Sequence, residues 1–219
     1  PGQNAGRVAL RRLGETFREL KTYRQALLML FAFIVYNDGI GTIIRMAGIY
    51  GTELGFPATS LMVAILIPQL VGVPCAFLFG GLAGRIGPRG AIFLGLAVYV
   101  GITIAAFFMD TLTEFFILAA AIGMVQGGTQ ALSRSLFASL IPRHKSSEFF
   151  GFYGVLDKFA GMLGPTFFAT AAQLTGSSRF GILSILVFFV VGGLILSRVN
   201  VAEGRRVARA AEAHLAPVE

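Results

Sequence analysis

Six long apolar runs take up most of this 219-residue chain. A transmembrane helix needs about 20 residues to cross a hydrocarbon core about 30 Å thick, and each run is about that long. Inside a bilayer only helices and closed barrels satisfy every backbone polar group, so the pattern predicts an all-α membrane protein, a bundle of six transmembrane helices. The runs cover residues 25–50, 60–83, 90–109, 115–140, 149–174 and 180–199.

The basic residues between the runs fall on alternate links. Of the 18 lysines and arginines, 14 lie in four segments, and the links between those segments are acidic or nearly neutral. Positive charge gathers on the cytosolic side of membrane proteins, so we expect both termini to be cytosolic. The four segments are residues 7–24, the Arg85/Arg89 link, the Arg143/Lys145 link and residues 198–209.

Composition agrees with this class. Hydrophobic residues make up 55% of the chain and charged residues 13%, with a mean hydropathy of +0.76. The net charge of +7 flanks the runs, which favours anionic lipid headgroups of the bilayer as its partner over nucleic acid. We predict three parts: residues 1–24 as a cytosolic linker with an amphipathic helix or a flexible charged leader, 25–199 as the bundle, and 200–219 as a cytosolic tail.

The first run carries the most informative charge. Asp38 lies about 20 Å along that helix, where a carboxylate must be protonated, paired or hydrated. Asn37 beside it can bind an uncharged substrate group or a neighbouring helix. Asp38 is either a functional group or a polar lock between two helices. For Arg45, two helical turns on, we expect snorkelling to the outer headgroups; the alternative is a role as counter-ion to Asp38 or as ligand for a substrate carboxylate.

The fifth run carries a second pair. Asp157 lies among glycines spaced three and four residues apart, a face that lets another helix approach closely. Lys158 is turned about 100° from it, so each charge needs a partner on another helix. Pro165 is expected to kink this helix. A structural network and a proton or substrate site both fit these residues.

A neutral polar stripe runs along the fourth helix. Gln126, Gln130 and Ser133 lie at i, i+4 and i+7. Amides at that spacing can bind a zwitterion without a large desolvation cost, or they can join neighbouring helices. Both interpretations stay open.

The link between the second and third runs is rich in glycine and arginine. Its spacing and position resemble the G-x-L-A-D-R-x-G loop of the major facilitator superfamily, although the acidic position of that motif is a glycine here. The resemblance implies half of a twelve-helix carrier and a loop on the cytosolic face. The matching residues are Gly80, Gly84, Arg85, Gly87 and Arg89.

Further motifs are similar to one family of that superfamily, the vacuolar amino-acid effluxers associated with autophagy and their bacterial relatives. They are Tyr36-Asn37-Asp38-Gly39, Gln126-Gly127-Gly128, Ser133-Arg134-Ser135 and Ser147-Glu148-Phe149-Phe150-Gly151. The resemblance implies a secondary transporter of small polar metabolites, most simply amino acids, in a bacterial plasma membrane. It also implies a missing N-terminal half, or a second copy of the chain, as partner.

Enzymatic chemistry finds little support. The histidines, His144 and His214, lie outside the runs, so we expect no metal, no cofactor and no histidine-based catalysis. A non-transporting scaffold is the alternative to a carrier. If transport is proton-coupled, Asp38 is the expected carrier of the proton, because its nearest cation along the helix, Arg45, is two turns away.

Overall fold

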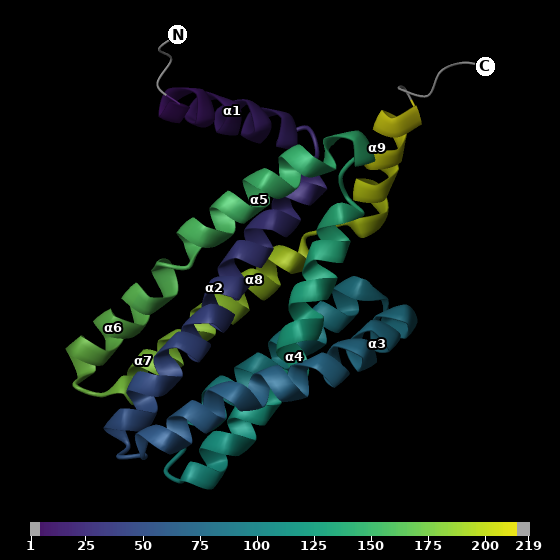
Figure 1. Cartoon of the computed structure of the whole chain (residues 1–219). Helices are drawn as coiled ribbons and strands as arrows, with labels where there is room; N and C mark the ends of the chain where they lie inside the picture. Colours follow the sequence, from purple (N-terminus) through teal and green to yellow (C-terminus); the bar gives the residue numbers. More distant parts are fainter. Residues whose placement is uncertain (1–4, 214–219) are drawn as a thin grey trace.

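The computed structural model describes residues 5–213, which form helices joined by short links, with no strand among them (Figure 1). The all-α prediction is therefore confirmed for this part of the chain. In order the elements are α1 (Ala5–Leu20), α2 (Arg24–Glu53), α3 (Ala58–Phe107), α4 (Leu112–Ala138), the 3₁₀ turn η1 (Arg143–Lys145), α5 (Ser146–Ala160), α6 (Leu163–Thr175), α7 (Ser178–Ser184), α8 (Leu186–Ser197) and α9 (Val201–Ala213).

Four helical segments of the described residues are long and apolar enough to cross a membrane. They are α2, α3, α4 and the segment Ser178–Ser197, which consists of α7 and α8 together. The sequence contains six apolar runs, and the difference has two causes. The second and third runs both lie within α3, and the fifth run is divided between α5 and α6, which have 15 and 13 residues.

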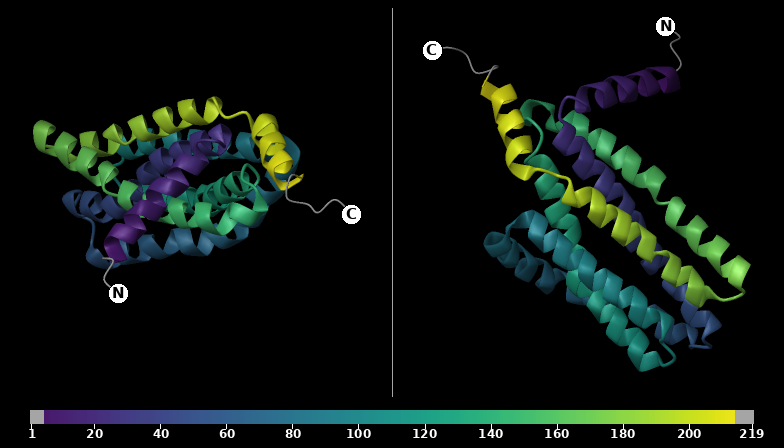
Figure 2. Two further views of the ribbon diagram at one scale, coloured as in Figure 1. Left: turned by 90° about the horizontal axis from the view of Figure 1, so that it is seen from above. Right: turned by 180° about the vertical axis from the view of Figure 1, so that it is seen from behind.

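α3 contains one sharp reversal. At 50 residues it would extend about 75 Å if it were straight, more than twice the thickness of a hydrocarbon core. Gly87 has φ 79° and ψ 155°, backbone angles that favour glycine, and Pro88 follows it. The ribbon doubles back there (Figures 1 and 2), and Leu61 and Ala106, near the two ends of α3, line one pocket. Residues 58–86 and 88–107 are therefore two antiparallel arms.

α2 lies at the centre of the bundle, between α8 on one side and α5 with α6 on the other (Figure 1). Tyr36 is fully buried, and its hydroxyl is hydrogen-bonded to Ser133 of α4. Phe33 stacks on Tyr153 of α5, with ring centroids 4.6 Å apart. These aromatic contacts hold α2 against α4 and α5 and fix the angular position of the polar residues that follow Tyr36.

α1 and α9 lie at the same end of the bundle, and α1 crosses that end (Figure 2). Its apolar face is attached: Leu20 is buried, and the ring of Phe17 lies 5.9 Å from that of Phe152 in α5. The segment before α2 is thus a docked amphipathic helix over its described residues. The division into linker, bundle and tail, and the cytosolic position of the ends, stay predictions, and residues 214–219 of the tail lie outside the described part.

Candidate functional site

The predicted kink in the fifth run is a complete break in the helix. α5 ends at Ala160, Gly161 and Met162 follow, and α6 begins at Leu163. Pro165 explains the position, because it has no N–H to donate to the carbonyl four residues earlier, that of Gly161, and its ring would clash with it. The break exposes the last carbonyls of α5 and the first N–H groups of α6, which need other partners.

Asp38 of α2 supplies one of those partners. Its Oδ2 accepts a hydrogen bond of 2.7 Å from the backbone N–H of Gly164, in the first turn of α6. The carboxylate is 1% exposed and lies about halfway along α2. The N-terminus of a helix carries partial positive charge, so it stabilises an ionised carboxylate placed there. Gly164 permits the contact, because a Cβ at this position would collide with Thr42 of α2.

Arg45 supplies the other partner. Its Nη2 donates to the Gly161 carbonyl at 3.0 Å and lies 3.5 Å from Oδ1 of Asp38. The expectation that Arg45 snorkels outward is wrong, and the counter-ion alternative is the one that the structure shows. Side chains on a helix lean toward its N-terminus, and the long arginine covers the two turns back to Asp38. A bare Gly41 makes room, since a Cβ there would lie 3.2 Å from Nη1 and Nη2.

This geometry also removes the premise on which Asp38 was selected as a proton carrier. The nearest cation is in contact with the carboxylate and not two turns away. A guanidinium and a backbone N–H both stabilise the ionised form of a carboxylate. These two partners favour the ionised form of Asp38, while the burial of its side chain opposes that form.

Asn37, the residue before Asp38, takes part in a second set of contacts that joins α2, α4 and α5. The Asn37 amide donates to Oδ1 of Asp157 in α5 at 2.7 Å, and the Gln130 amide of α4 donates to Oδ1 of Asn37 at 3.2 Å. Asp157 is only partly buried. The expectation that Asp157 needs a partner on another helix is confirmed, with Asn37 as that partner.

The remaining predicted pathway residues lie apart from these contacts. Lys158 is exposed and, among the described residues, forms no ion pair within 4.0 Å. Gln126 lines a pocket one turn from Gln130. Ser133, in the same polar stripe, bonds to Tyr36 and serves helix packing. The structure thus forms two neighbouring sets, Asp38 with Arg45 and Asn37 with Gln130 and Asp157, and leaves Gln126 and Lys158 outside both.

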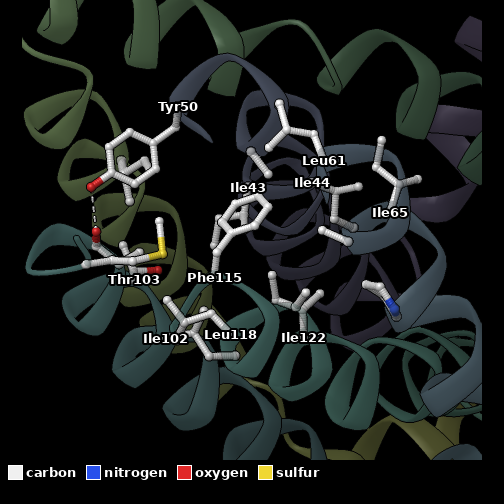
Figure 3. Close-up of a pocket in the computed structure, with 18 of the residues that line it drawn as sticks. Ile43, Ile44, Tyr50, Leu61, Ile65, Ile102, Thr103, Phe115, Leu118 and Ile122 are labelled. Carbon is white, nitrogen blue, oxygen red and sulfur yellow. Dashed lines mark hydrogen bonds between the residues drawn. The ribbon is translucent and has the colours of Figure 1, made fainter. Parts of the chain in front are cut away.

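The pocket beside Gln126 is apolar and has a volume of about 100 Å³ (Figure 3). It lies between α2, both arms of α3, α4 and Ile182 of α7, and the amides of Gln69 and Gln126 are among its few polar groups. Tyr50 closes one side, where its hydroxyl donates to the Ala106 carbonyl. The labelled lining residues in Figure 3 include Ile43, Ile44, Leu61, Ile65, Ile102, Phe115, Leu118 and Ile122.

The glycine- and arginine-rich link has a packing role at the reversal of α3. Gly87 makes the turn, and Arg89 donates to the carbonyls of Ser197 and Val199 at the end of α8. A cation at a helix C-terminus satisfies the last carbonyls and complements the helix dipole. Gly80, Gly84 and Arg85 are exposed. Sequence reasoning found the loop but not the helix end that Arg89 binds.

Two contributors to the site were missed. Gly41 has no side chain, and its absence leaves room for Arg45. Thr42 contacts Gly164 across the α2–α6 interface and donates to the Asp38 carbonyl. The spacing of Asp38, Gly41 and Arg45 at i, i+3 and i+7 could have identified Gly41, because it places all three residues on one helix face.

Four helical segments long and apolar enough to cross a membrane indicate an integral membrane protein, and the comparisons give its family. The family model described as "Vacuole effluxer Atg22 like" matches residues 1–209. The chain belongs to this family, and the resemblance found in the sequence is confirmed.

Two relatives illustrate the range of similarity. An uncharacterized MFS-type transporter, YxiO, from Bacillus subtilis is 41% identical over 189 residues, which are 86% of this chain and 44% of that protein. Autophagy-related protein 22 from Cryptococcus neoformans is 29% identical over 198 residues, covering 83% of this chain and 35% of that protein. The chain therefore spans less than half the length of the curated relatives it matches.

Proposed function

We propose that this chain is one half of a secondary transporter that moves a small polar metabolite, amino acids in the first instance, by alternating access. In this proposal six segments cross the bilayer. The two arms of α3 cross separately, α5 and α6 together form one broken crossing, and α7 with α8 forms the last. Both ends lie in the cytosol and the membrane is a bacterial plasma membrane, as the distribution of basic residues and the resemblance favour.

The helix break beside Asp38 and Arg45 carries the proposal. Secondary transporters form substrate sites near the middle of the bilayer from discontinuous helices, whose free ends point at charged groups. Here the ends of α5 and α6 meet opposite the middle of α2, and both are bonded to charged side chains. A protein that needed only stability would gain little from a broken helix and a charge pair at this depth.

The substrate class rests on the family and on the chemistry of these side chains. The family model is named for a vacuole effluxer, and efflux is the direction we propose for this chain. Asp38, Arg45 and Asp157 offer both signs of charge, and Asn37 and Gln130 offer neutral amides. These groups suit the two charges and the polar atoms of a zwitterion.

A complete pathway needs a second wall. We propose that this wall is the N-terminal half of the carrier or, failing that, a second copy of the chain. The first arm of α3 presents large apolar side chains that the described residues leave uncovered. They include Leu70, Phe77 and Leu78, which are 75%, 80% and 73% exposed. Lipid and the partner half would share this surface.

Counterflow in proteoliposomes tests the function. The chain is reconstituted together with its missing half, and a panel of radiolabelled amino acids is exchanged against unlabelled ones. We expect stimulated exchange for at least one amino acid, absent from liposomes that contain the N-terminal half alone. No exchange across the panel, in protein that remains folded, would remove the amino-acid assignment and favour a non-transporting scaffold.

Cysteine labelling tests the six crossings. A membrane-impermeant reagent added outside sealed cells is expected to label Ser177→Cys, between α6 and α7, and not Ser146→Cys, at the start of α5. The expected pattern requires α5 and α6 to cross the bilayer once between these two positions. Labelling of both positions from outside, or of Ser146→Cys alone, would contradict the proposed topology.

A further inference from the structure

Two oxygen atoms at the α5–α6 break face the same nitrogen of Arg45. Nη2 donates to the Gly161 carbonyl at 3.0 Å and lies 3.5 Å from Oδ1 of Asp38. The carbonyl is the one that Pro165 leaves without a helical donor. A freed backbone carbonyl next to a buried carboxylate is the arrangement with which broken transmembrane helices bind cations.

Arg45 satisfies this position only in part. Oδ1 of Asp38 is buried and, among the described residues, accepts no hydrogen bond, whereas Oδ2 accepts the bond from Gly164. The Arg45 side chain is 46% exposed, while the carboxylate it faces is 1% exposed. The guanidinium thus reaches a buried carboxylate oxygen from a side chain that is itself nearly half exposed, so we expect a change of rotamer to be enough to withdraw it.

We propose that Oδ1 of Asp38 and the Gly161 carbonyl form a cation site that Arg45 occupies at rest and that a small primary ammonium group takes over. An ammonium has three N–H donors at one compact charge, which suits two oxygens that a single guanidinium nitrogen now shares. The site as such does not depend on transport. That the ammonium belongs to the transported molecule rests on the proposed function.

The exchange of one cation for the other acts on the helix break. While Arg45 is in place, α2 holds the end of α5 through the Gly161 carbonyl and the start of α6 through Asp38. When an ammonium replaces it, Asp38 stays bonded to Gly164, but the hydrogen bond from Arg45 that ties α2 to the end of α5 is lost. The end of α5 is then free to move against α2, which couples occupancy of the site to the position of α5.

Chemical rescue tests the cation site without transport. Arg45→Ala is purified in a mild detergent, and its Tm is measured with methylammonium chloride and with tetramethylammonium chloride at equal ionic strength. We expect the substitution to lower Tm by several degrees, because a buried carboxylate loses its counter-ion. Methylammonium should restore at least half of this loss and tetramethylammonium none, since the latter has no N–H and a larger radius.

Matched variants separate this result from a general salt effect. Arg45→Lys carries its own ammonium, so it should keep a Tm near that of the wild type and respond little to methylammonium. The double variant Asp38→Ala/Arg45→Ala lacks the anion and should show no rescue. Arg179→Ala breaks the pair with Asp110, whose side chain is 72% exposed, and should also show none.

Either of two outcomes would overturn the site. One is the absence of rescue in Arg45→Ala while Arg45→Lys is stable, and the other is equal rescue in the double variant. If Arg45→Ala does not fold, Arg45→Gln, which keeps most of the side-chain volume, takes its place in the same comparison. Rescue without amino-acid counterflow would retain the site and remove the proposed function, whereas counterflow without rescue would do the opposite.

Discussion

The two sides of this bundle are held together by different kinds of interaction. On one side, α4 packs against the first arm of α3 through small residues: Gly123 lies under Pro68 and Val71, and Gly128 under Phe79. Within residues 5–213 no side-chain hydrogen bond joins α3 to α4. On the other side, α2 meets α5 and α6 through two bonds to broken helix ends and an amide–carboxylate contact, next to an ion pair within α2 itself.

The difference assigns the two sides different mechanical roles. In lipid, close packing of backbones depends on van der Waals contact over a matched surface, which a small shift destroys. Hydrogen bonds and ion pairs can exchange partners, so they allow two arrangements of nearly equal energy. We therefore expect the α3–α4 side to move as a rigid wall and the α2–α5–α6 side to rearrange during transport.

The largest effect on stability should follow from adding a side chain at the contact between α3 and α4. At Gly123 an added Cβ would lie 2.8 Å from the Pro68 Cα and 2.9 Å from its carbonyl oxygen, so backbone must shift. Overpacking costs about 1–3 kcal/mol, and more where only backbone can yield. We expect Gly123→Ala to lower Tm by several degrees and Gly123→Leu to abolish folded protein in detergent.

The matched control for that pair is Gly101 in the second arm of α3, where a Cβ would meet no atom within 4 Å. Gly101→Ala and Gly101→Leu should leave Tm almost unchanged. Since alanine and leucine form helix more readily than glycine, equal losses at Gly123 and Gly101 would mean that contact between α3 and α4 does not govern stability on this side.

On the α2–α5–α6 side, substitutions of the two aspartates should have different effects on transport. Asp38→Asn removes the charge that faces Arg45, and a bond to a charged group is worth about 1.5–3 kcal/mol, so amino-acid counterflow should fall at least about tenfold. In Asp157→Asn the new amide keeps an oxygen that can accept from Asn37, so the loss should stay below about threefold. Rates are normalised to protein in the membrane.

A second readout of the same variants addresses proton coupling. Uptake driven by a pH gradient is measured beside counterflow. Because Arg45 and Gly164 both stabilise ionised Asp38, we expect Asp38→Asn to lower the two rates together. A variant that lost only the gradient-driven uptake would restore Asp38 as the proton carrier, and equal behaviour of both aspartates would erase the proposed distinction between them.

How far sequence reasoning reached depends on the kind of contact. The apolar runs and the break at Pro165 follow from local rules, because backbone hydrogen bonding in lipid leaves few options. The reversal at Gly87 falls in a predicted link for the same reason. These features need no knowledge of neighbouring helices.

The partners of the buried charges could not be read in this way. Periodicity gives the face of a residue on its own helix, but not which helix meets that face. Asn37 was a candidate, yet nothing in the sequence paired it with Asp157, 120 positions away. Arg45 was misassigned because distance along the helix was counted between Cα atoms, whereas the long side chain and the bare Gly41 close the gap.

A smaller effect is expected from the neutral contact at the junction of the two sides. Gln130→Ala removes the donor to Asn37 and leaves the bond between Asn37 and Asp157 in place. A neutral hydrogen bond contributes about 1 kcal/mol, so Tm should fall by a few degrees and the counterflow KM should rise a few-fold.

Gln173→Ala is its control. That side chain is exposed near the end of α6, so the same loss of an amide should change neither Tm nor KM. If Gln130→Ala lowered amino-acid counterflow as much as Asp38→Asn does, neutral and charged contacts would be equally important. The contrast between the two sides would then lose its basis in charge.

The smallest effect should come from the ion pair that ties α1 to the bundle, which belongs to neither side. Lys145 lies 3.0 Å from Glu19 of α1 and 3.7 Å from Glu148. The hydrogen bond to Glu19 is the largest influence that raises the pKa of Lys145 above its ordinary value. A raised lysine pKa stabilises the fold below the ordinary value, about 10.4, and this contribution disappears as the pH rises through the folded-state value.

We therefore expect α1 to loosen only at strongly alkaline pH, and Lys145→Gln to loosen it at neutral pH. Partly exposed pairs contribute about 0–1 kcal/mol, so the measure is amide hydrogen exchange in α1, with global Tm shifted by no more than a few degrees. Arg11→Gln is the control, because Arg11 pairs with Glu15 within α1. If Lys145→Gln loosens α1 no more than Arg11→Gln does, the tie through Lys145 contributes no more than an exposed pair within α1 itself.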